Sequence, residues 1–235
     1  MREECRLGGL RLGVLGGSFN PIHFGHMHIA RSCQRLFSLS RVHFVVAASP
    51  PHKSGEDMIP FMHRYAMVCL ATMGRPSFVP SLVELEPPAS PFSVDTLGKL
   101  AGQVDRRKGI LYFIAGEDSL NEVKSWRESE TLLTTYNFIF VRRPGTRKED
   151  HRDILPERSL SQVLDLCGLG RVQIRRRIGE EERSGESRIY IVDLNAPDIS
   201  ATEIRILAGA GKSLKSAVPA PVRDYIRKLN LYGER

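Results

Sequence analysis

Hydrophobic positions along the chain fall into short continuous runs, which alternate with stretches where apolar residues recur every three or four positions. Short continuous runs are typical of strands buried on both faces of a sheet, and the wider spacing is typical of helices that bury one face. Strands are predicted at 10–15, 42–48, 78–85, 110–115, 137–141 and 188–194. Helices are predicted at 25–37, 60–73, 94–103, 129–135, 202–208 and 221–229.

This alternation predicts an α/β fold: a doubly wound, Rossmann-like parallel sheet with helices on both faces. In such sheets the ligand crevice lies beyond the carboxyl ends of the strands. We expect a single domain over 1–235. Region 144–188 does not fit the alternation and is rich in Arg, Glu, Ser and Gly, so we interpret it as an elaborated insertion with a short helix within 161–167.

Composition agrees with a soluble enzyme. The chain has 235 residues, of which 41% are hydrophobic and 26% charged. No apolar run approaches the ~20 residues of a membrane helix, and the first residues lack the apolar core of a signal peptide. The four cysteines are scattered without a Cys-x-x-Cys pair, which favours reduced thiols and a cytoplasmic location.

The net charge of +7 allows two interpretations. A positive cleft would raise the local concentration of anionic substrates, whereas a solvated surface would carry the same surplus without a catalytic role. Arginines at 171 and 175–177 are followed at once by glutamates at 180–182. This mixture predicts an exposed, self-compensated segment and argues against a nucleic-acid track.

A glycine turn follows the first predicted strand, where residues 16–28 read Gly-Gly-Ser-Phe-Asn-Pro-Ile-His-Phe-Gly-His-Met-His. A turn from strand into helix presents unpaired backbone N–H groups and roughly half a positive charge, which suits a phosphate. Gly16 and Gly17 let the backbone approach a ligand that a side chain would block. His23 and His26 share one helix face. These features predict a polyphosphate site.

Within this turn, Gly-Ser-Phe-Asn-Pro-x-His-x-Gly-His at 17–26 resembles the HxGH signature of the nucleotidyltransferase superfamily. It resembles most the nicotinate or nicotinamide mononucleotide adenylyltransferases. Relatives that act on phosphopantetheine or glycerol phosphate usually carry Thr-Phe-Asp where this chain has Ser18, Phe19 and Asn20. The resemblance extends over 11–233, apart from the insertion.

Further segments resemble the same family. Pro-Pro-His-Lys ends at Lys53, and Pro-Phe-Ser-Val-Asp-Thr-Leu at 91–97 is similar to a family segment that lines the mononucleotide, with Ser93 keeping a hydroxyl. Gly116 and Asp118 match Gly-x-Asp, which implies a carboxylate on the ribose. Residues 198–205 are similar to Ile-Ser-Ser-Thr-x-Ile-Arg and end at Arg205, although Ala201 replaces one serine.

Two of these matches have a structural explanation as well. Ser200 and Glu203 form a Ser-x-x-Glu capping box, which accounts for both residues without catalysis. Trp126, the single tryptophan, follows Gly-x-Asp at a spacing similar to that of the family. It lies in a polar setting at 123–128, which favours stacking on a pyridine ring over core packing. Both roles of Trp126 are kept open.

The resemblance implies adenylyl transfer from ATP to nicotinate mononucleotide, giving deamido-NAD and pyrophosphate, with Mg²⁺ carried by the ATP phosphates and no protein metal site. Catalysis is then assigned to His23, His26, Lys53 and Arg205. ATP is assigned to Gly16, Gly17, Ser18, Phe19, His23, His26, Gly116, Asp118, Ile199, Ser200, Thr202 and Arg205. The mononucleotide is assigned to Asn20, Lys53, Ser93 and Trp126.

Two alternatives stay open. The first is nicotinamide mononucleotide as substrate, or dual specificity, because backbone amides can read either a carboxylate or a carboxamide. The second is a basic RNA-binding or regulatory protein on the same fold. The complete set of His, Lys and Arg candidates argues against it, because a relative without the activity would be expected to lose some of them. No membrane partner is expected, and the sequence leaves a homo-oligomer open.

Overall fold

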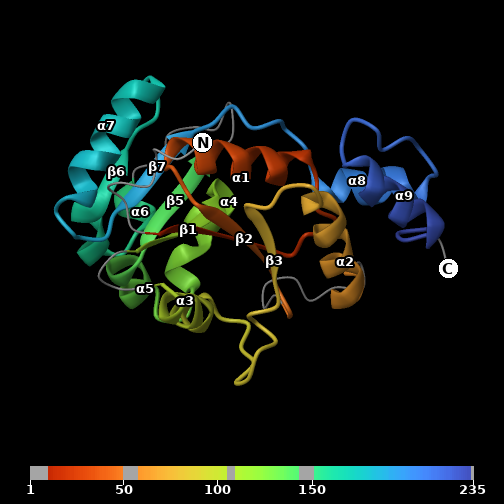
Figure 1. Cartoon of the computed structure of the whole chain (residues 1–235), viewed down its shortest axis with the longest axis horizontal. Coiled ribbons are helices and arrows are strands. Elements are labelled where there is room, and N and C mark those ends of the chain that lie inside the picture. The colour runs from red at the N-terminus through yellow and green to blue at the C-terminus, as the bar shows by residue number, and fades with distance from the viewer. Residues whose placement is uncertain (1–9, 50–57, 105–108, 143–150, 234–235) are drawn as a thin grey trace.

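The computed structural model describes residues 10–49, 58–104, 109–142 and 151–233. At its centre is a seven-stranded sheet in the order β3-β2-β1-β4-β5-β7-β6 (Figure 1). Every pairing in it is parallel, which confirms the predicted doubly wound class. The strands are β1 (Arg11–Gly17), β2 (Arg41–Val46), β3 (Phe78–Ser81), β4 (Ile110–Gly116), β5 (Asn137–Arg142), β6 (Val163–Asp165) and β7 (Ile189–Asp193).

The six helices predicted from the alternation are present, and their bounds differ from the prediction by no more than one residue at either end. These helices are α1 (Phe24–Leu36), α2 (Phe61–Thr72), α3 (Ser93–Gly102), α5 (Ser129–Thr135), α8 (Ala201–Gly209) and α9 (Ala220–Lys228). The additional helical elements are α4 (Glu117–Glu122), η1 (Val123–Ser125), α6 (His151–Ile154), η2 (Glu157–Gln162) and α7 (Arg171–Glu182).

The sheet separates two hydrophobic cores, and successive residues of one strand belong to opposite cores. In β4, Tyr112 and Ile114 join the core beneath α1, α2, α7, α8 and α9. Their neighbours Leu111 and Phe113 join the core beneath α3, α4 and α5. Because both faces of β4 are covered, the strand reads as a continuous apolar run.

Two expectations about the secondary structure are wrong, and one helix of 12 residues was not predicted. The strand predicted at 78–85 ends at Ser81, and Leu82 and Leu85 beyond it are partly exposed. The helix predicted within 161–167 is instead β6, which pairs with β7 at the edge of the sheet. Helix α7 was not predicted, because only Ile174 and Ile178 are buried among its Arg and Glu residues.

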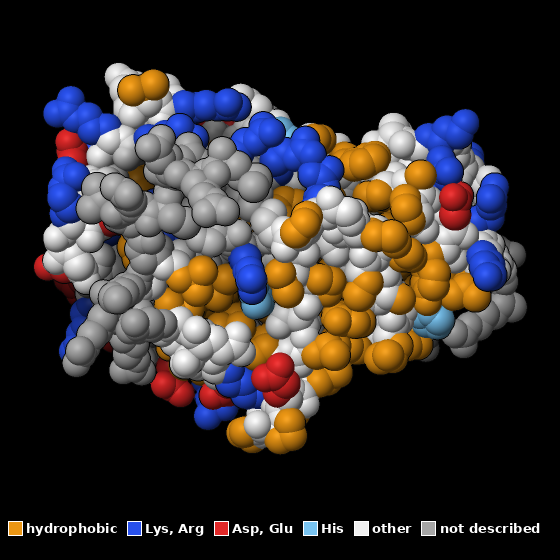
Figure 2. Space-filling model, viewed as in Figure 1, with side chains coloured by type: hydrophobic (Ala, Val, Ile, Leu, Met, Phe, Trp, Pro, Cys, Tyr) orange, Lys and Arg blue, Asp and Glu red, His pale blue; other side chains and the backbone are white. Residues whose placement is uncertain are grey.

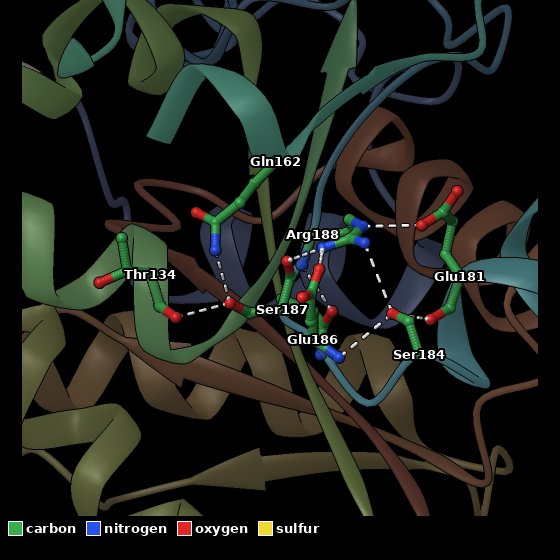
Figure 3. Close-up of polar contacts among 8 residues, drawn as sticks. Thr134, Gln162, Glu181, Ser184, Glu186, Ser187 and Arg188 are labelled. Atoms are coloured by element: carbon green, nitrogen blue, oxygen red, sulfur yellow. Dashed lines mark hydrogen bonds and ion pairs between the residues drawn. The ribbon is translucent and has the colours of Figure 1, made fainter. Parts of the chain in front are cut away.

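Salt bridges in the described part of the insertion confirm part of the expected compensation between its charges. Arg176 pairs with Glu180 at 2.9 Å, one helical turn on. Arg188 binds Glu181 and Glu186, both at 2.7 Å, and Ser187 donates to the carbonyl of Thr134 in α5 (Figure 3). The junction of α7 and β7 is thereby tied to the opposite face of the sheet.

Glu182, the last residue of α7, reaches the main sheet. Its carboxylate accepts a hydrogen bond from Arg11 Nη2 and another from the Tyr112 hydroxyl, each at 2.5 Å. Burial beside this carboxylate raises the pKa of Tyr112, so its hydroxyl stays protonated and donates. Glu182 therefore anchors the insertion to the amino end of β1, through Arg11, and to β4, through Tyr112.

The surface charge is distributed unevenly. Figure 2 shows Lys and Arg side chains along α1 and α7, and hydrophobic side chains gathered over α2. Arg31, Arg35 and Arg176 are exposed, as are Met62 and Met73 at the two ends of α2. Part of the positive surplus therefore lies on open helix faces rather than in a cleft.

Candidate active site

A cavity of about 730 Å³ lies at the carboxyl ends of β1, β4 and β5. This is the edge at which the sheet order and the glycine turn predicted a ligand crevice. Its walls are the β1–α1 turn, the start of α4, the end of β5, and the segment that leads into α8. The predicted residues that line it are Gly16, Gly17, Ser18, Asn20, His23, His26, Gly116, Asp118, Ile199, Ser200, Thr202 and Arg205.

The two histidines lie face to face in this cavity. Their ring centroids are 3.7 Å apart, with 31° between the ring planes. The backbone N–H of His23, the residue that caps α1, donates to Nδ1 of His26 at 3.3 Å. A neutral His26 ring consequently carries its proton on Nε2 and can donate it to a ligand.

Two neighbouring residues fix these rings. A Cβ atom at Gly25 would lie 2.9 Å from Cε1 and Nδ1 of His23, so only glycine leaves room for that ring. Phe19 packs edge-on against His26 with ring centroids 5.0 Å apart. Phe19 is 1% exposed and supports His26 from the core, so its side chain does not line the cavity as the ATP assignment implied.

The second wall is the N-terminal end of α8. Ser200 caps this helix and accepts from the backbone N–H of Glu203 at 3.5 Å, which is one of the two hydrogen bonds of the predicted capping box. Arg205 Nη2 donates to Thr202 Oγ1, and Nη1 donates to the backbone carbonyl of Asn20, both at 3.1 Å. The arginine thus spans from α8 to the glycine turn, and two helix N-termini converge on one cavity.

The third wall begins at Gly116, which ends β4 and caps α4. Asp118 follows in the first turn of α4 and is exposed in the cavity. Helix α4 was not predicted, yet it explains why a Gly-x-Asp segment can offer both a close backbone approach and a carboxylate at a strand end. The arrangement suits hydroxyl groups of a sugar.

Comparison with known proteins agrees with this geometry. A cytidylyltransferase-like family model matches residues 14–206. A protein of Pelobacter propionicus named "Probable nicotinate-nucleotide adenylyltransferase" is 36% identical over 96% of this chain and 99% of that protein. The chain belongs to the nicotinate-nucleotide adenylyltransferase family. A relative of the same name from Geobacter metallireducens is 38% identical, with 95% and 98% of the two chains covered.

A solved structure supports the fold assignment. The Plasmodium falciparum nicotinic acid mononucleotide adenylyltransferase, complexed with NaAD, superposes with a TM-score of 0.67. Its sequence identity is 19%, and 95% of this chain and 97% of that chain are covered. The likeness therefore establishes the shared sheet and helix arrangement. Among the described residues, no helix is long and apolar enough to cross a bilayer.

Sequence reasoning missed two arginines of this adenylyltransferase. Arg142 ends β5, lines the cavity, and lies 3.5 Å from the carboxylate of Glu117 and 3.9 Å from that of Asp165. Arg64 in α2 is 1% exposed and donates from Nη1 to the carbonyls of Ser18 and Ala47, both at 2.8 Å. The sequence did offer a signal for each residue: Arg142 ends an apolar strand, and Arg64 interrupts a largely apolar helix.

The mononucleotide candidates are only partly brought together. Ser93 and Trp126 do not line the described cavity. Trp126 is half-buried and packs edge-on against Phe113 at 5.7 Å, so the core-packing role has direct support. Next to Trp126, Arg127 lies over the ring of Phe92 at 4.9 Å, which places the two family segments side by side. Lys53 lies outside the described residues.

Proposed function

We propose that this chain transfers the adenylyl group of ATP to nicotinate mononucleotide, giving deamido-NAD and pyrophosphate. The observation that carries the proposal is the convergence of a histidine pair, Arg205 and two helix N-termini on one cavity. Each of these groups favours negative charge, and together they suit a triphosphate.

The reaction needs one bond made and one bond broken at phosphorus. A phosphate oxygen of the mononucleotide attacks the α-phosphorus of ATP, and the bond to the β-phosphate oxygen breaks in line, releasing pyrophosphate. The attacking oxygen is already ionised near neutral pH, so no general base is required. Catalysis then consists of positioning the two phosphates and neutralising the charge that grows on the α-phosphoryl oxygens.

The position of each residue in the cavity determines which phosphate we assign to it. We assign His26, which can donate from Nε2, to the α-phosphoryl oxygens, and His23 to the neighbouring phosphates. Arg205, at the start of α8, is assigned to the β- and γ-phosphates, which a guanidinium can bind with two parallel donors. Lys53 is proposed as a further phosphate contact on the family resemblance alone.

The nucleoside parts are assigned to the remaining walls. Asp118 and the backbone at Gly116 are proposed for the ATP ribose, since both lie in the cavity beside α4. Asn20, Ser93 and Trp126 are proposed for the mononucleotide. The contact of Arg127 with Phe92 supports a common mononucleotide face for the last two.

We propose Mg²⁺ as the metal that enters with ATP. Among the described residues, no group of three or more His, Cys, Asp or Glu side chains is placed to hold a metal ion. The carboxylates on the cavity wall are Asp118, Glu122 and Asp198. This donor set fits an ion bound mainly by phosphate oxygens and water, which would reduce repulsion between the two anionic substrates. The cytoplasmic location expected from the sequence stays a prediction.

A pyrophosphate-release assay tests the proposal. ATP is supplied with nicotinate mononucleotide or nicotinamide mononucleotide in turn, with Mg²⁺ present and with Mg²⁺ chelated. Turnover with the nicotinate substrate that is lost on chelation is the expected result. Equal turnover with both mononucleotides would establish dual specificity. No turnover with either would contradict the proposed adenylyl-transfer activity.

A further inference from the structure

The segment after α9 returns to the floor of the cavity. The hydroxyl of Tyr232 donates to Oδ1 of Asn20 at 2.9 Å, although the two residues are 212 positions apart. Asn20 is 5% exposed and is one of the residues that line the cavity. The backbone carbonyl of Tyr232 also lies 2.7 Å from where a Cβ atom at Gly209 would stand. The segment therefore packs directly against α8.

The surroundings of Tyr232 make its hydroxyl a permanent donor. Its ring packs against the core formed by α1, α2, α8 and α9. Burial raises the pKa of Tyr232, and the opposing effect of the nearby Arg205 and Arg64 guanidinium groups is smaller. The hydroxyl thus keeps its proton over the whole physiological range and holds Asn20 Oδ1 as an acceptor.

This contact decides which way the Asn20 amide points. With Oδ1 engaged by Tyr232, the Nδ2 end, which carries two N–H donors, is directed the opposite way. The backbone carbonyl of Asn20 is held separately by Arg205. A flipped amide would present an oxygen where a phosphate oxygen is expected, and the two would repel each other.

We propose that Tyr232 is a positioning residue for adenylyl transfer: its hydroxyl orients the Asn20 amide so that Nδ2 donates to the phosphate of the mononucleotide. This inference rests on the proposed function. It assigns the segment after α9 a role in the reaction, through Asn20 and without any contact between Tyr232 and substrate.

The test compares Tyr232→Phe with Tyr225→Phe. Tyr225, seven positions earlier, also uses its hydroxyl in one 2.9 Å hydrogen bond, to His63 Nδ1, but it does not line the cavity. Both variants keep the ring and lose one hydrogen bond, so similar melting temperatures are expected. Only Tyr232→Phe should lower kcat/KM for the mononucleotide, by about 5- to 10-fold, which is the usual worth of one such bond. Its KM for ATP should change less than twofold.

A double-mutant cycle completes the test. In an Asn20→Ala background, Tyr232→Phe should cause no further loss of kcat/KM, because the group that it orients is gone. Losses that multiply, or an equal loss in Tyr225→Phe, would overturn the positioning role. Normal wild-type turnover with an unimpaired Tyr232→Phe variant would refute this inference alone, whereas an inactive wild-type chain would refute the proposed function with it.

Discussion

At the scale of single residues, the geometry of His26 leads to a kinetic prediction. Its Nδ1 accepts from the His23 backbone, so in a neutral ring Nε2 is the nitrogen that can donate to charge that develops in the transition state. His26→Ala should lower kcat by ~10²- to 10³-fold, as loss of one such donor usually does, and should change ATP affinity only a few-fold. Steady-state kinetics and equilibrium ATP binding measure the two effects.

His28→Ala is the matched control. His28 lies two residues further along α1, on another face of the helix, and its Nε2 bonds to the carbonyl of Leu194 at 2.9 Å, outside the cavity lining. This variant should lose stability and keep kcat. A fall in ATP affinity as large as the fall in kcat would assign His26 to the ground state instead.

Gly25 is required by the position of the His23 ring. In Gly25→Ala the new methyl group would meet ring atoms at 2.9 Å, so the ring must move away from its place beside His26. We expect at least a tenfold loss of kcat/KM, since misplacement of a catalytic group by about 1 Å can cost ~10²-fold.

Gly98→Ala makes the same substitution in α3, where, apart from its chain neighbours and the backbone of the helix itself, no heavy atom of the described residues lies within 4 Å of the added Cβ. This control should retain full activity and gain about 0.5–1 kcal/mol of stability from the better helix propensity of alanine. Full activity in Gly25→Ala would show that the ring is free to shift without consequence.

The packing of Trp126 and its proposed stacking role can be tested separately. Its edge-on contact with Phe113 predicts a lower melting temperature for Trp126→Ala. If one face also stacks on the pyridine ring, KM for the mononucleotide should rise by roughly 5- to 150-fold, the range for ~1–3 kcal/mol of stacking, with KM for ATP nearly unchanged.

Trp126→Phe should recover much of both losses. A Trp126→Ala variant that is destabilised but keeps its KM for the mononucleotide would leave core packing as the whole explanation. Such a result would also remove Trp126 from the proposed mononucleotide face.

The sequence was informative about residues wherever chemistry and position coincide in a short segment. The glycine turn identified Gly16, Gly17, His23 and His26, because the motif itself forms one wall of the cavity. It could not identify Arg64, whose role depends on carbonyls of the residues that directly follow β1 and β2 rather than on its own neighbours in α2. Contacts of that kind exist only in three dimensions.

At the scale of secondary-structure elements, the insertion gives a stability prediction. Glu182→Ala removes the acceptor of the buried Tyr112 hydroxyl and of Arg11, so we expect a loss of about 1–3 kcal/mol of unfolding free energy. Catalytic constants should stay unchanged, because none of the three residues lines the cavity. Chemical denaturation and the pyrophosphate assay measure the two quantities.

Glu180→Ala is the comparison within α7. Glu180 pairs with Arg176 on the exposed face of the helix, and exposed pairs contribute little. Its unfolding midpoint should match that of the wild type. Equal destabilisation by both variants would mean that α7 is stabilised by helical charge pairs and not by its anchor to β1 and β4.

Prediction of elements succeeded where one face of a helix is clearly apolar. In α1 and α3 the buried residues recur at helical spacing, and their bounds were found to within one residue. It failed for β6, which has three residues and lies at the sheet edge, and for α7, whose two buried isoleucines are outnumbered by arginines. Too few buried positions were present to define a period.

At the scale of the whole molecule, the cavity joins segments that are distant along the chain. Asn20 in the β1–α1 turn receives hydrogen bonds from Arg205 and from Tyr232, 185 and 212 positions away. The alternation of elements predicted the parallel sheet, but the side-chain pairs that close the site could not be inferred from it.

That long reach has a consequence for the time course of refolding. Local helices form early, whereas contacts of large sequence separation form late, because loop closure must come first. On dilution from denaturant, the circular dichroism of the helices should recover before adenylyl-transfer activity. The lag should be set by closure of the ring of contacts from the β1–α1 turn through α8 to Tyr232, and simultaneous recovery of both signals would show that this ring closes together with the helices.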